Sequence, residues 1–244
     1  MRTVLFSLGV VLSFGLACAP LASASKLADQ ALSDPTRTPA DRAADTLRLP
    51  SQTLDFAGVK PGMKIGELFP GGGYFTRPLS DIVGPTGKIY MLETTRWKSA
   101  IEADSKVLAD PGRKNVALDA TAFGAFKLPE KIDLFWITQN YHDLHIKEYG
   151  NVDLGVFNKQ VFDALKPGGI YFILDQAANP GASDVDIAKL HRIDKAQIVK
   201  EVTAAGFKLV AEGDFLHRAS DDHTKPIFEL KGMTDQYALK FVKP

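Results

Sequence analysis

The fold of this chain is decided by residues 63–76, which read MKIGELFPGGGYFT. The apolar pattern over Met63–Phe69 predicts a β-strand, and the pattern over Tyr74–Val83 predicts a helix. The three glycines between them allow the backbone to turn tightly and to approach a ligand closely. Backbone N–H groups at the start of the helix favour a polar or anionic group there. Taken alone, this pattern is just as typical of a structural turn between a strand and a helix.

Strand-like and helix-like stretches alternate from this segment to residue 242. The further strands are expected at Lys88–Glu93, Val116–Asp119, Ile132–Gln139, Ile170–Asp175, Phe207–Asp214 and Tyr237–Val242. The further helices are expected at Lys98–Ala109, Asp153–Leu165 and Lys195–Ala205. This alternation predicts an α/β fold built on a doubly wound, mostly parallel, seven-stranded sheet.

The first residues are typical of a secretory signal peptide. Arg2 supplies a positive charge, Val4–Leu16 is an apolar run, and Ala22–Ala24 offers a small-residue cleavage site. The apolar run is short for a transmembrane anchor, which needs about 20 residues. We therefore expect residues 1–24 to be removed from a periplasmic or secreted protein. No later stretch is apolar enough to predict an integral membrane segment.

Cys18 is the only cysteine, and it lies inside this leader. A chain cut after Ala24 has no thiol, which suits an oxidising compartment. Gly15–Cys18 also loosely resembles a lipoprotein cleavage box, so lipid anchoring through Cys18 is the alternative to a freely released protein.

The remaining chain is predicted to form an arm and one domain. Residues 25–50 are rich in Ala, Asp, Arg and Pro, and we expect them to form an N-terminal arm that packs on the core. Within the arm, Thr38 is expected to cap a short helix that begins at Pro39. Residues 51–244 hold the alternating strands and helices.

The composition is that of an ordinary globular protein, with 45% hydrophobic and 24% charged residues. The 29 Lys and Arg residues balance the 29 Asp and Glu residues. A chain without a basic excess lacks the electrostatic character of a nucleic-acid-binding protein, so no nucleic-acid partner is predicted.

Glu93 makes the glycine turn more informative. It ends the second expected strand, about 20 residues after Gly73. In nucleotide-binding βαβ units, an acidic residue at this place accepts hydrogen bonds from ribose hydroxyls. The pair therefore indicates an adenosine-containing ligand. A nicotinamide dehydrogenase is a weaker interpretation, because its G-x-G-x-x-G spacing is absent.

From about residue 50 onward the chain resembles the class I S-adenosylmethionine (SAM)-dependent methyltransferases. Glu67–Thr76 looks like their motif I, and Glu93 matches the acid that follows this motif. Asp119 and Ala120 are placed like the residues that contact adenine, and Leu165–Gly169 looks like the turn before their fifth strand. The last two expected strands resemble the C-terminal antiparallel hairpin of this Rossmann-like methyltransferase fold.

The chain is similar, more narrowly, to a group of exported bacterial proteins described as predicted methyltransferases. The segments that carry this likeness are Pro70–Tyr74, Asn140–Asp143, His191–Asp194 and Gly232–Asp235. The resemblance implies SAM as the cofactor and a small molecule as the substrate. It implies cofactor-binding roles for Glu67, Gly71, Gly72, Gly73, Glu93, Asp119, Ala120 and Asn140. Phe69 stands where the family has the first glycine of its G-x-G-x-G loop, which should narrow the space beside the methionine moiety.

The candidate catalytic residues are His142 and Asp143. They follow the expected strand Ile132–Gln139 and should lie at the carboxyl end of the sheet, where ligands bind in such folds. His142 has an unperturbed pKa that suits a general base near neutral pH, and either Asp143 or Asp175 is expected to orient it. A hydrogen-bonded structural histidine is the alternative.

The histidines also invite a metal interpretation. His142, Asp143 and His145 could supply ligands to zinc, and His191 could join them in space. No further ligand follows at a recognisable spacing, so the sequence predicts no metal site.

Farther along, Asp194 is expected to cap a helix. Arg192 is expected to form an ion pair with a carboxylate at the sheet end, and pairing with a substrate anion is the alternative. A solvated polar loop is expected around four residues, His217, Asp221, Asp222 and His223.

Our main hypothesis is a class I SAM-dependent methyltransferase that transfers a methyl group to a small-molecule acceptor. The acceptor atom is left open among O, N, S and C. The alternative is a non-catalytic, exported ligand-binding protein on a methyltransferase fold. Two observations motivate this alternative: the export signal, since SAM is made in the cytosol, and Phe69 in the glycine loop.

Overall fold

The computed structural model describes residues 22–244. Cys18 and residues 1–21 of the expected leader lie outside this part of the chain, so export and cleavage stay predictions. The helices are α1 (Ala22–Leu32), α2 (Pro39–Arg48), α3 (Pro50–Ala57), α4 (Thr76–Val83), α5 (Lys98–Leu108), α6 (Leu154–Ala164), α7 (Asp184–Leu190) and α8 (Lys195–Ala204), with two 3₁₀ turns, η1 (His142–His145) and η2 (Ile227–Leu230). Among the described residues, no helix has both the length and the hydropathy needed to cross a membrane.

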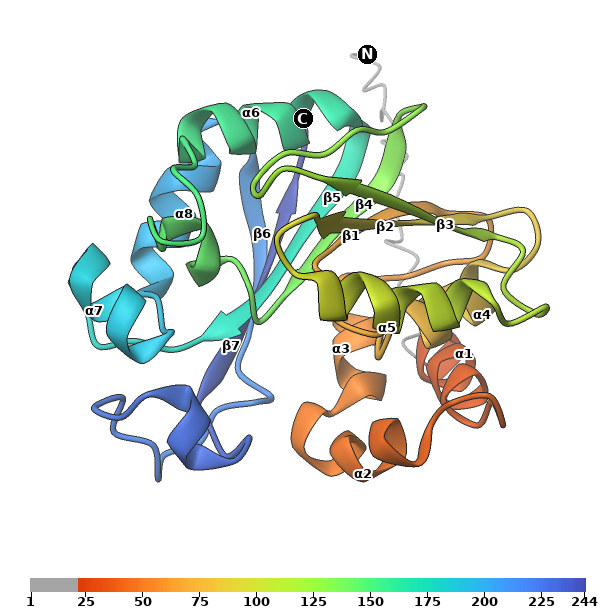
Figure 1. The fold of residues 1–244 in the computed structure, drawn as a ribbon, viewed down its shortest axis with the longest axis horizontal. Coiled ribbons are helices and arrows are strands. Elements are labelled where there is room, and N and C mark those ends of the chain that lie inside the picture. The colour runs from red at the N-terminus through yellow and green to blue at the C-terminus, as the bar shows by residue number, and fades with distance from the viewer. Residues whose placement is uncertain (1–21) are drawn as a thin grey trace, which may run out of the picture.

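Seven strands form one sheet in the order β3-β2-β1-β4-β5-β7-β6. Their bounds are β1 (Lys64–Leu68), β2 (Lys88–Thr94), β3 (Val116–Thr121), β4 (Ile132–Thr138), β5 (Leu165–Gln176), β6 (Lys208–Gly213) and β7 (Gln236–Val242). All neighbours are parallel except β7, which runs antiparallel to both β5 and β6. This sheet confirms the predicted doubly wound fold and its C-terminal antiparallel hairpin (Figure 1). The strand order reverses between β1 and β4, and ligands in such sheets bind at the carboxyl ends beside this point.

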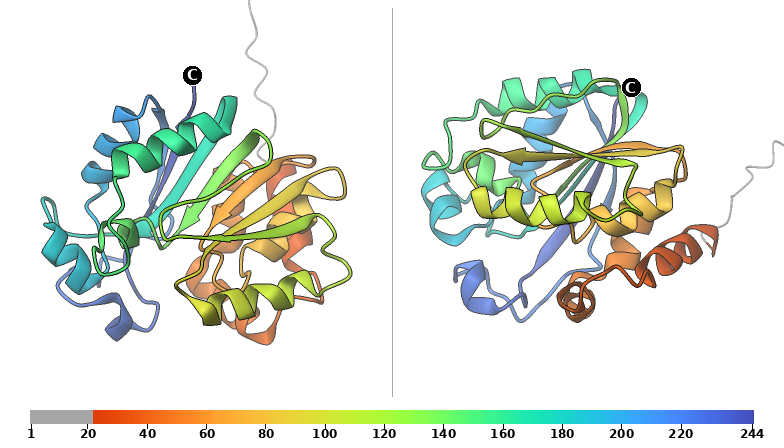
Figure 2. Two further views of the ribbon diagram at one scale, coloured as in Figure 1. Left: turned by 45° about the horizontal axis from the view of Figure 1, so that its top comes forward. Right: turned by 45° about the vertical axis from the view of Figure 1, so that its right-hand side comes forward.

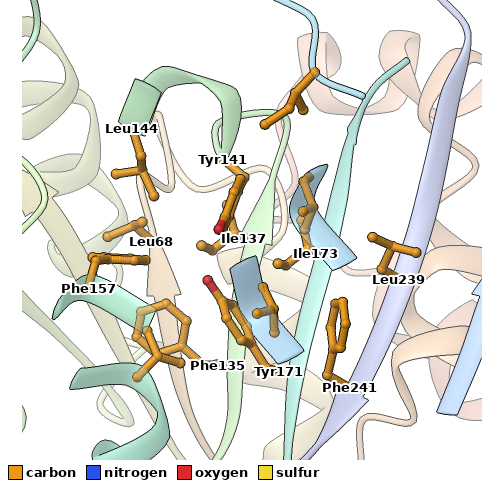
Figure 3. Packing of buried hydrophobic residues seen from close by; sticks show 14 of the residues in the cluster. Leu68, Phe135, Ile137, Tyr141, Leu144, Phe157, Tyr171, Ile173, Leu239 and Phe241 are labelled. Carbon is orange, nitrogen blue, oxygen red and sulfur yellow. The ribbon is translucent and has the colours of Figure 1, made fainter. Parts of the chain in front are cut away.

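Helices cover both faces of the sheet because successive side chains along a buried strand point to opposite faces. In β4, Phe135 and Ile137 belong to the core under α6 and α8, whereas Leu134 and Trp136 belong to the core under α1, α3 and α4. Figure 2 shows α6 and α5 on opposite sides of the sheet. Figure 3 shows the first of these cores, in which the buried Phe157 of α6 packs towards strand residues of β1, β4 and β5.

Three helices were not expected from the sequence: α1, α3 and α7. α3 is easily read as a loop because it begins at Pro50, only one residue after α2 ends, with Leu49 in a left-handed conformation between them. β5 is longer than predicted. It begins at Leu165 because Gly168 and Gly169 exchange backbone hydrogen bonds with Lys243. Residues 166–169 are not paired with β4, where the register shifts between Leu165 and Ile170.

The N-terminal helices are fixed to α4 by charged contacts. Thr38 caps α2 as predicted, accepting a hydrogen bond from the backbone N–H of Asp41 at 3.0 Å. The Asp41 carboxylate pairs with Arg77 of α4, and Asp45 accepts a hydrogen bond from the Tyr74 hydroxyl at 2.7 Å. These bonds place α2 beside the glycine turn.

The loop before β7 departs from the prediction. Asp221 was expected to be solvated, but it is buried and forms an ion pair with the fully buried Arg192 at 2.9 Å. Oδ2 of Asp221 also accepts a hydrogen bond from the backbone N–H of Asp235 at 2.7 Å. The prediction was wrong because neighbouring polar residues such as Asp222 are exposed and local polarity does not reveal a buried partner. Arg192 does form an ion pair, but with this loop carboxylate and not with one at the sheet end, and the predicted cap of α8 by Asp194 is confirmed.

Candidate functional site

The glycine turn between β1 and α4 packs against α5. Gly71, Gly72 and Gly73 all have positive φ angles. A Cβ atom at Gly73 would lie 2.5 Å from Cγ2 of Val107, so this position requires glycine for steric reasons. The backbone N–H of Gly72 donates to the Asp104 carboxylate at 2.7 Å. The turn is therefore held from behind by a helix rather than suspended as a free loop.

Glu67 lies in β1 and is almost completely buried. Its carboxylate accepts a hydrogen bond from the hydroxyl of Thr76, the first residue of α4, at 2.6 Å. Burial raises the pKa of Glu67 to about 8. Glu67 thus ties the end of β1 to the start of α4, beneath the glycine turn.

Glu93 lies near the end of β2 with 1% of its surface exposed. One carboxylate oxygen accepts the backbone N–H of Thr94 at 2.7 Å, and the other is buried without a hydrogen-bond partner. Burial raises the pKa of Glu93 to about 7, and the carboxylate of Asp104 adds to this shift. The neighbouring Asp104 also has a buried oxygen without a partner, so a proton shared between the two carboxyl groups or a donor from a ligand would stabilise this place.

The two residues predicted to contact adenine lie on β3. Ala120 is exposed and is paired in register with Glu93 on the neighbouring strand. Asp119 is half-buried and accepts a hydrogen bond from the backbone N–H of Lys127 at 3.0 Å. Ala120 therefore lies beside Glu93 on the neighbouring strand, whereas Asp119 is bonded to the loop that follows β3.

An aromatic cluster gathers the segments that follow β1, β2, β3 and β4. Its members are Phe69, Trp97, Phe123 and Tyr149. The Phe69 ring stacks on Phe123 with 5.2 Å between centroids and meets the edge of Trp97 at 4.9 Å. Phe69 adopts a left-handed φ of 52°, which ends β1 one residue before the predicted end. The cluster packs close to the position where the resemblance places the cofactor.

A second group of polar residues lies beyond β4 and β5. The 3₁₀ turn η1 begins at His142, whose Nδ1 lies 2.7 Å from an Asp175 oxygen; the other oxygen of Asp175 accepts the His142 backbone N–H. Burial opposes protonation of this imidazole, but the carboxylates of Asp175 and Asp143 hold the pKa of His142 above its usual range. Of the two orienting residues considered from the sequence, Asp175 is the one that bonds the ring.

Asp143 is also buried, and its two oxygens have different surroundings. Oδ2 accepts a hydrogen bond from the Asn140 amide at 2.9 Å. Oδ1 has no hydrogen-bond partner but lies 3.3 Å from Nε2 of His142 and 3.3 Å from Nδ1 of His191. His145, by contrast, turns towards Glu201 at 3.2 Å.

The structure thus divides the predicted site residues into two groups. Gly71–Gly73, Glu93 and Ala120 lie around the ends of β1–β3, whereas Asn140, His142 and Asp143 lie together beyond β4. Sequence reasoning missed Asp104, because a single acid in an amphipathic helix gives no functional signal. His191 was considered only as a residue that might approach in space, since no spacing links it to η1.

A cavity of about 310 Å³ opens at the carboxyl ends of β4 and β5. Arg48 of α2 donates to the Gln139 side chain at 2.8 Å, and Gln139 donates to Gln236 at 2.9 Å. The Gln176 side-chain oxygen, which has no hydrogen-bond partner, belongs to the same lining. Phe228 also lines the cavity, and its ring centroid lies 4.7 Å from that of His191. The wall of this cavity is therefore mostly apolar, with amide groups and one guanidinium set among side chains such as Leu47 and Ile227.

Comparison with known proteins relates the fold to one class of enzymes. No protein-family model matches the chain, and no curated protein matches it in sequence. A SAM-dependent methyltransferase from Aquifex aeolicus superposes with a TM-score of 0.60 at 17% identity, covering 90% of this chain and 98% of that chain. A SAM-dependent methyltransferase from Mesorhizobium loti superposes with a TM-score of 0.55 at 14% identity, covering 83% of this chain and 99% of that chain. The glycopeptide N-methyltransferase MtfA, complexed with SAM, superposes with a TM-score of 0.54 at 19% identity, covering 86% of this chain and 100% of that chain. The chain therefore has the fold of SAM-dependent methyltransferases.

Proposed function

We propose that this protein is a SAM-dependent methyltransferase acting on a small molecule. The observation that carries the proposal is the Glu93 carboxylate, which lies at the end of β2 with one buried oxygen unpaired. In sheets of this order, that position faces the ribose of an adenosine ligand. Two vicinal hydroxyls would satisfy the orphaned oxygen and favour ionised Glu93.

The glycine turn and its neighbours would hold the remainder of the cofactor. SAM supplies an electrophilic methyl group, so the protein's task is mainly to position an acceptor in line with it. Gly71 presents its backbone close to the Glu93 carboxyl group, and Ala120 offers a small exposed side chain for a flat ring. Asn140, Glu67 and Asp119 remain proposed contacts on the strength of the resemblance.

The cavity at the ends of β4 and β5 is the proposed acceptor site. Arg48 and three glutamine side chains supply donors and acceptors within a mostly apolar wall. His142 and Asp143 are proposed as the catalytic pair that acts on the acceptor. Their neighbour His191 contacts Phe228 of the cavity wall, which connects the pair to this space.

One observation favours the second candidate, a ligand-binding protein that does not transfer methyl groups. The stacked rings of Phe69 and Phe123 pack beside the end of β1, where the family has open glycine backbone. A cofactor would have to displace or intercalate between these rings. If the rings do not move, the site would hold a smaller ligand than SAM.

Calorimetric titration of the purified protein with SAM and with S-adenosylhomocysteine tests the proposal. Saturable binding of both is expected. Glu93→Ala should abolish binding without unfolding the domain, whereas Glu102→Ala, an exposed acid on α5, should bind like the parent. Absence of binding by a folded parent protein would overturn the enzyme and favour the second candidate. Unchanged binding by Glu93→Ala would overturn the assignment of the ribose contact.

Export is proposed on the leader alone. The expected mature protein begins after Ala24 and is recovered from the periplasm or the medium. Mass spectrometry of the protein from fractionated cells measures this directly, and an intact residue 1–24 segment in the cytosol would contradict it. A lipid attached at Cys18 would identify the alternative of membrane anchoring.

A further inference from the structure

We propose that His142, Asp143 and His191 form a binding site for a divalent transition-metal ion. One ligand atom from each residue lies within 4.8 Å of the others. Oδ1 of Asp143 is 3.3 Å from Nε2 of His142 and 3.3 Å from Nδ1 of His191. Two ligands of a tetrahedral zinc ion, with bonds of about 2.0–2.1 Å, are about 3.3 Å apart. Two of the three donor separations thus match those around one ion, and the third is within 4.8 Å.

These short separations have poor hydrogen-bond geometry. Oδ1 of Asp143 is buried and meets no regular hydrogen-bond donor, although Nε2 of His142 and Nδ1 of His191 each lie 3.3 Å away. The two rings stand nearly perpendicular, at 83°. One oxygen and two nitrogens thus converge on one place, and either a cation there or a proton on His191 would satisfy the buried oxygen.

Two further side chains hold the ligands in place. Nδ1 of His142 lies 2.7 Å from Asp175, which leaves Nε2 as the ligand atom. Asn140 donates to Oδ2 of Asp143 at 2.9 Å, which leaves Oδ1 free. Carboxylates and amides that orient ligating groups in this way are a regular feature of metal sites.

The charges also balance with an ion present. Asp143 and Asp175 are both buried, and the nearby Arg192 forms an ion pair with Asp221. Two neutral imidazoles, two carboxylates and one divalent cation sum to zero, so the buried group carries no net charge. Buried carboxylates are stabilised either by such a cation or by protonation of the histidines.

Two imidazoles and one carboxylate favour zinc or another first-row transition metal over Mg²⁺ and Ca²⁺, which prefer oxygen ligands. Three protein ligands leave a coordination position for water or a substrate atom. The side chain of His191 is 13% exposed and lines a cavity of about 530 Å³, which gives an ion a route to the site. The inference goes beyond the proposed function, because metal binding does not require SAM or methyl transfer.

This site replaces the ligand set considered from the sequence. His145 is directed to Glu201, and His191 takes its place from the end of α7. There, a left-handed φ of 54° at His191 ends the helix.

Metal binding can be measured on tag-free protein, stripped with a chelator, in the absence of SAM. Titration with ZnCl₂ by calorimetry should show one ion per chain, and CoCl₂ should give the visible absorption of a nitrogen- and oxygen-ligated ion. His191→Ala and Asp143→Asn should weaken zinc binding by about 100-fold or more, since loss of a merely orienting residue costs about 10–100-fold. Asp175→Asn should fall within that smaller range. His145→Gln, changed in the same 3₁₀ turn, should bind like the parent.

Thermal unfolding keeps the test decisive where a variant is less stable. Zinc should raise the midpoint temperature of thermal unfolding of the parent and of His145→Gln. It should leave the midpoint temperature of folded His191→Ala unchanged. Absence of zinc and cobalt binding by the folded parent would overturn the site. Equal affinity of His191→Ala and the parent would overturn it as well.

Discussion

The Phe69 ring stacks on the Phe123 ring, with centroids 5.2 Å apart and planes inclined by 12°. Phe69 belongs to the glycine turn after β1 and Phe123 follows β3, so the stack joins two loops across the intervening end of β2. The proposed contact to ribose, Glu93, lies on that strand. A ligand that approaches Glu93 therefore meets this stack.

Replacing Phe69 should make the cofactor easier to bind. An aromatic pair is worth about 0.5–1.5 kcal/mol, so separating the stack to admit SAM reduces affinity by up to about tenfold. We expect Phe69→Gly to bind SAM up to about tenfold more tightly than the parent, measured by calorimetry. Phe126→Leu, which changes a buried ring packed on Phe135, is the control and should leave the affinity unchanged. Weaker binding by Phe69→Gly would mean that the ring contributes to the ligand site.

Cofactor binding should depend on pH through Glu93. Its pKa in the ligand-free protein is about 7, and the ribose contact favours the ionised carboxylate. The affinity for SAM should therefore be flat above pH 7 and fall by up to about tenfold for each pH unit below it. Calorimetry between pH 5.5 and pH 8.5 checks this. Glu93→Gln should bind weakly with no such slope, and a parent affinity that rises on acidification would contradict the prediction.

Glu67 should make the fold less stable as the pH rises. Burial in the folded state raises the pKa of this carboxyl group to about 8, whereas the ordinary pKa of a glutamate is 4.5. Stability is therefore fully present below pH 4.5 and is lost as the pH rises through 8. Relative to the parent, Glu67→Gln should gain on the order of 3 kcal/mol in unfolding free energy between pH 5 and pH 8. Urea denaturation of variant and parent at both pH values measures this gain. For the control Glu102→Gln, the difference in unfolding free energy from the parent should be the same at pH 5 and pH 8.

The buried pair of Arg192 and Asp221 should be a large contributor to the stability of the C-terminal region. Removing one partner leaves an uncompensated buried charge, which costs about 3–5 kcal/mol. We expect Arg192→Met to lower the unfolding free energy by this amount in urea denaturation. Lys189→Met, at an exposed position on α7, should change it little. Similar stabilities for the two variants would show that the pair is not important for folding.

The fold could be predicted from the sequence because the patterns that encode it are local. Strand and helix periodicity, the glycine turn and the Thr38 cap each depend on residues a few positions apart. α7 was missed because it is a short helix of seven residues beside a polar loop. α3 was missed because Leu49 and Pro50, which separate it from α2, are typical of a loop. The antiparallel hairpin came from the resemblance rather than from any pattern in β6 or β7.

The candidate site could be predicted only where it follows a strand. Glu93 and His142 lie at strand ends, which parallel topology brings to one edge of the sheet. His191 reaches η1 from a distant helix end, and Asp104 reaches the glycine turn from the middle of α5. Such meetings depend on the packing of helices, for which one sequence gives no spacing rule.

The position of β7 makes the site depend on a late segment of the chain. β6 is joined to the sheet only through β7, and Gln236 of β7 accepts the hydrogen bond from Gln139, which in turn accepts from Arg48. During synthesis, the N-terminal helices and β4 would therefore wait for residues made long after them. A nascent or truncated chain that ends before Gln236 would expose an unpaired edge of β5 and lack an assembled site. The order of synthesis thus delays completion of the site until the C-terminal strand has been made.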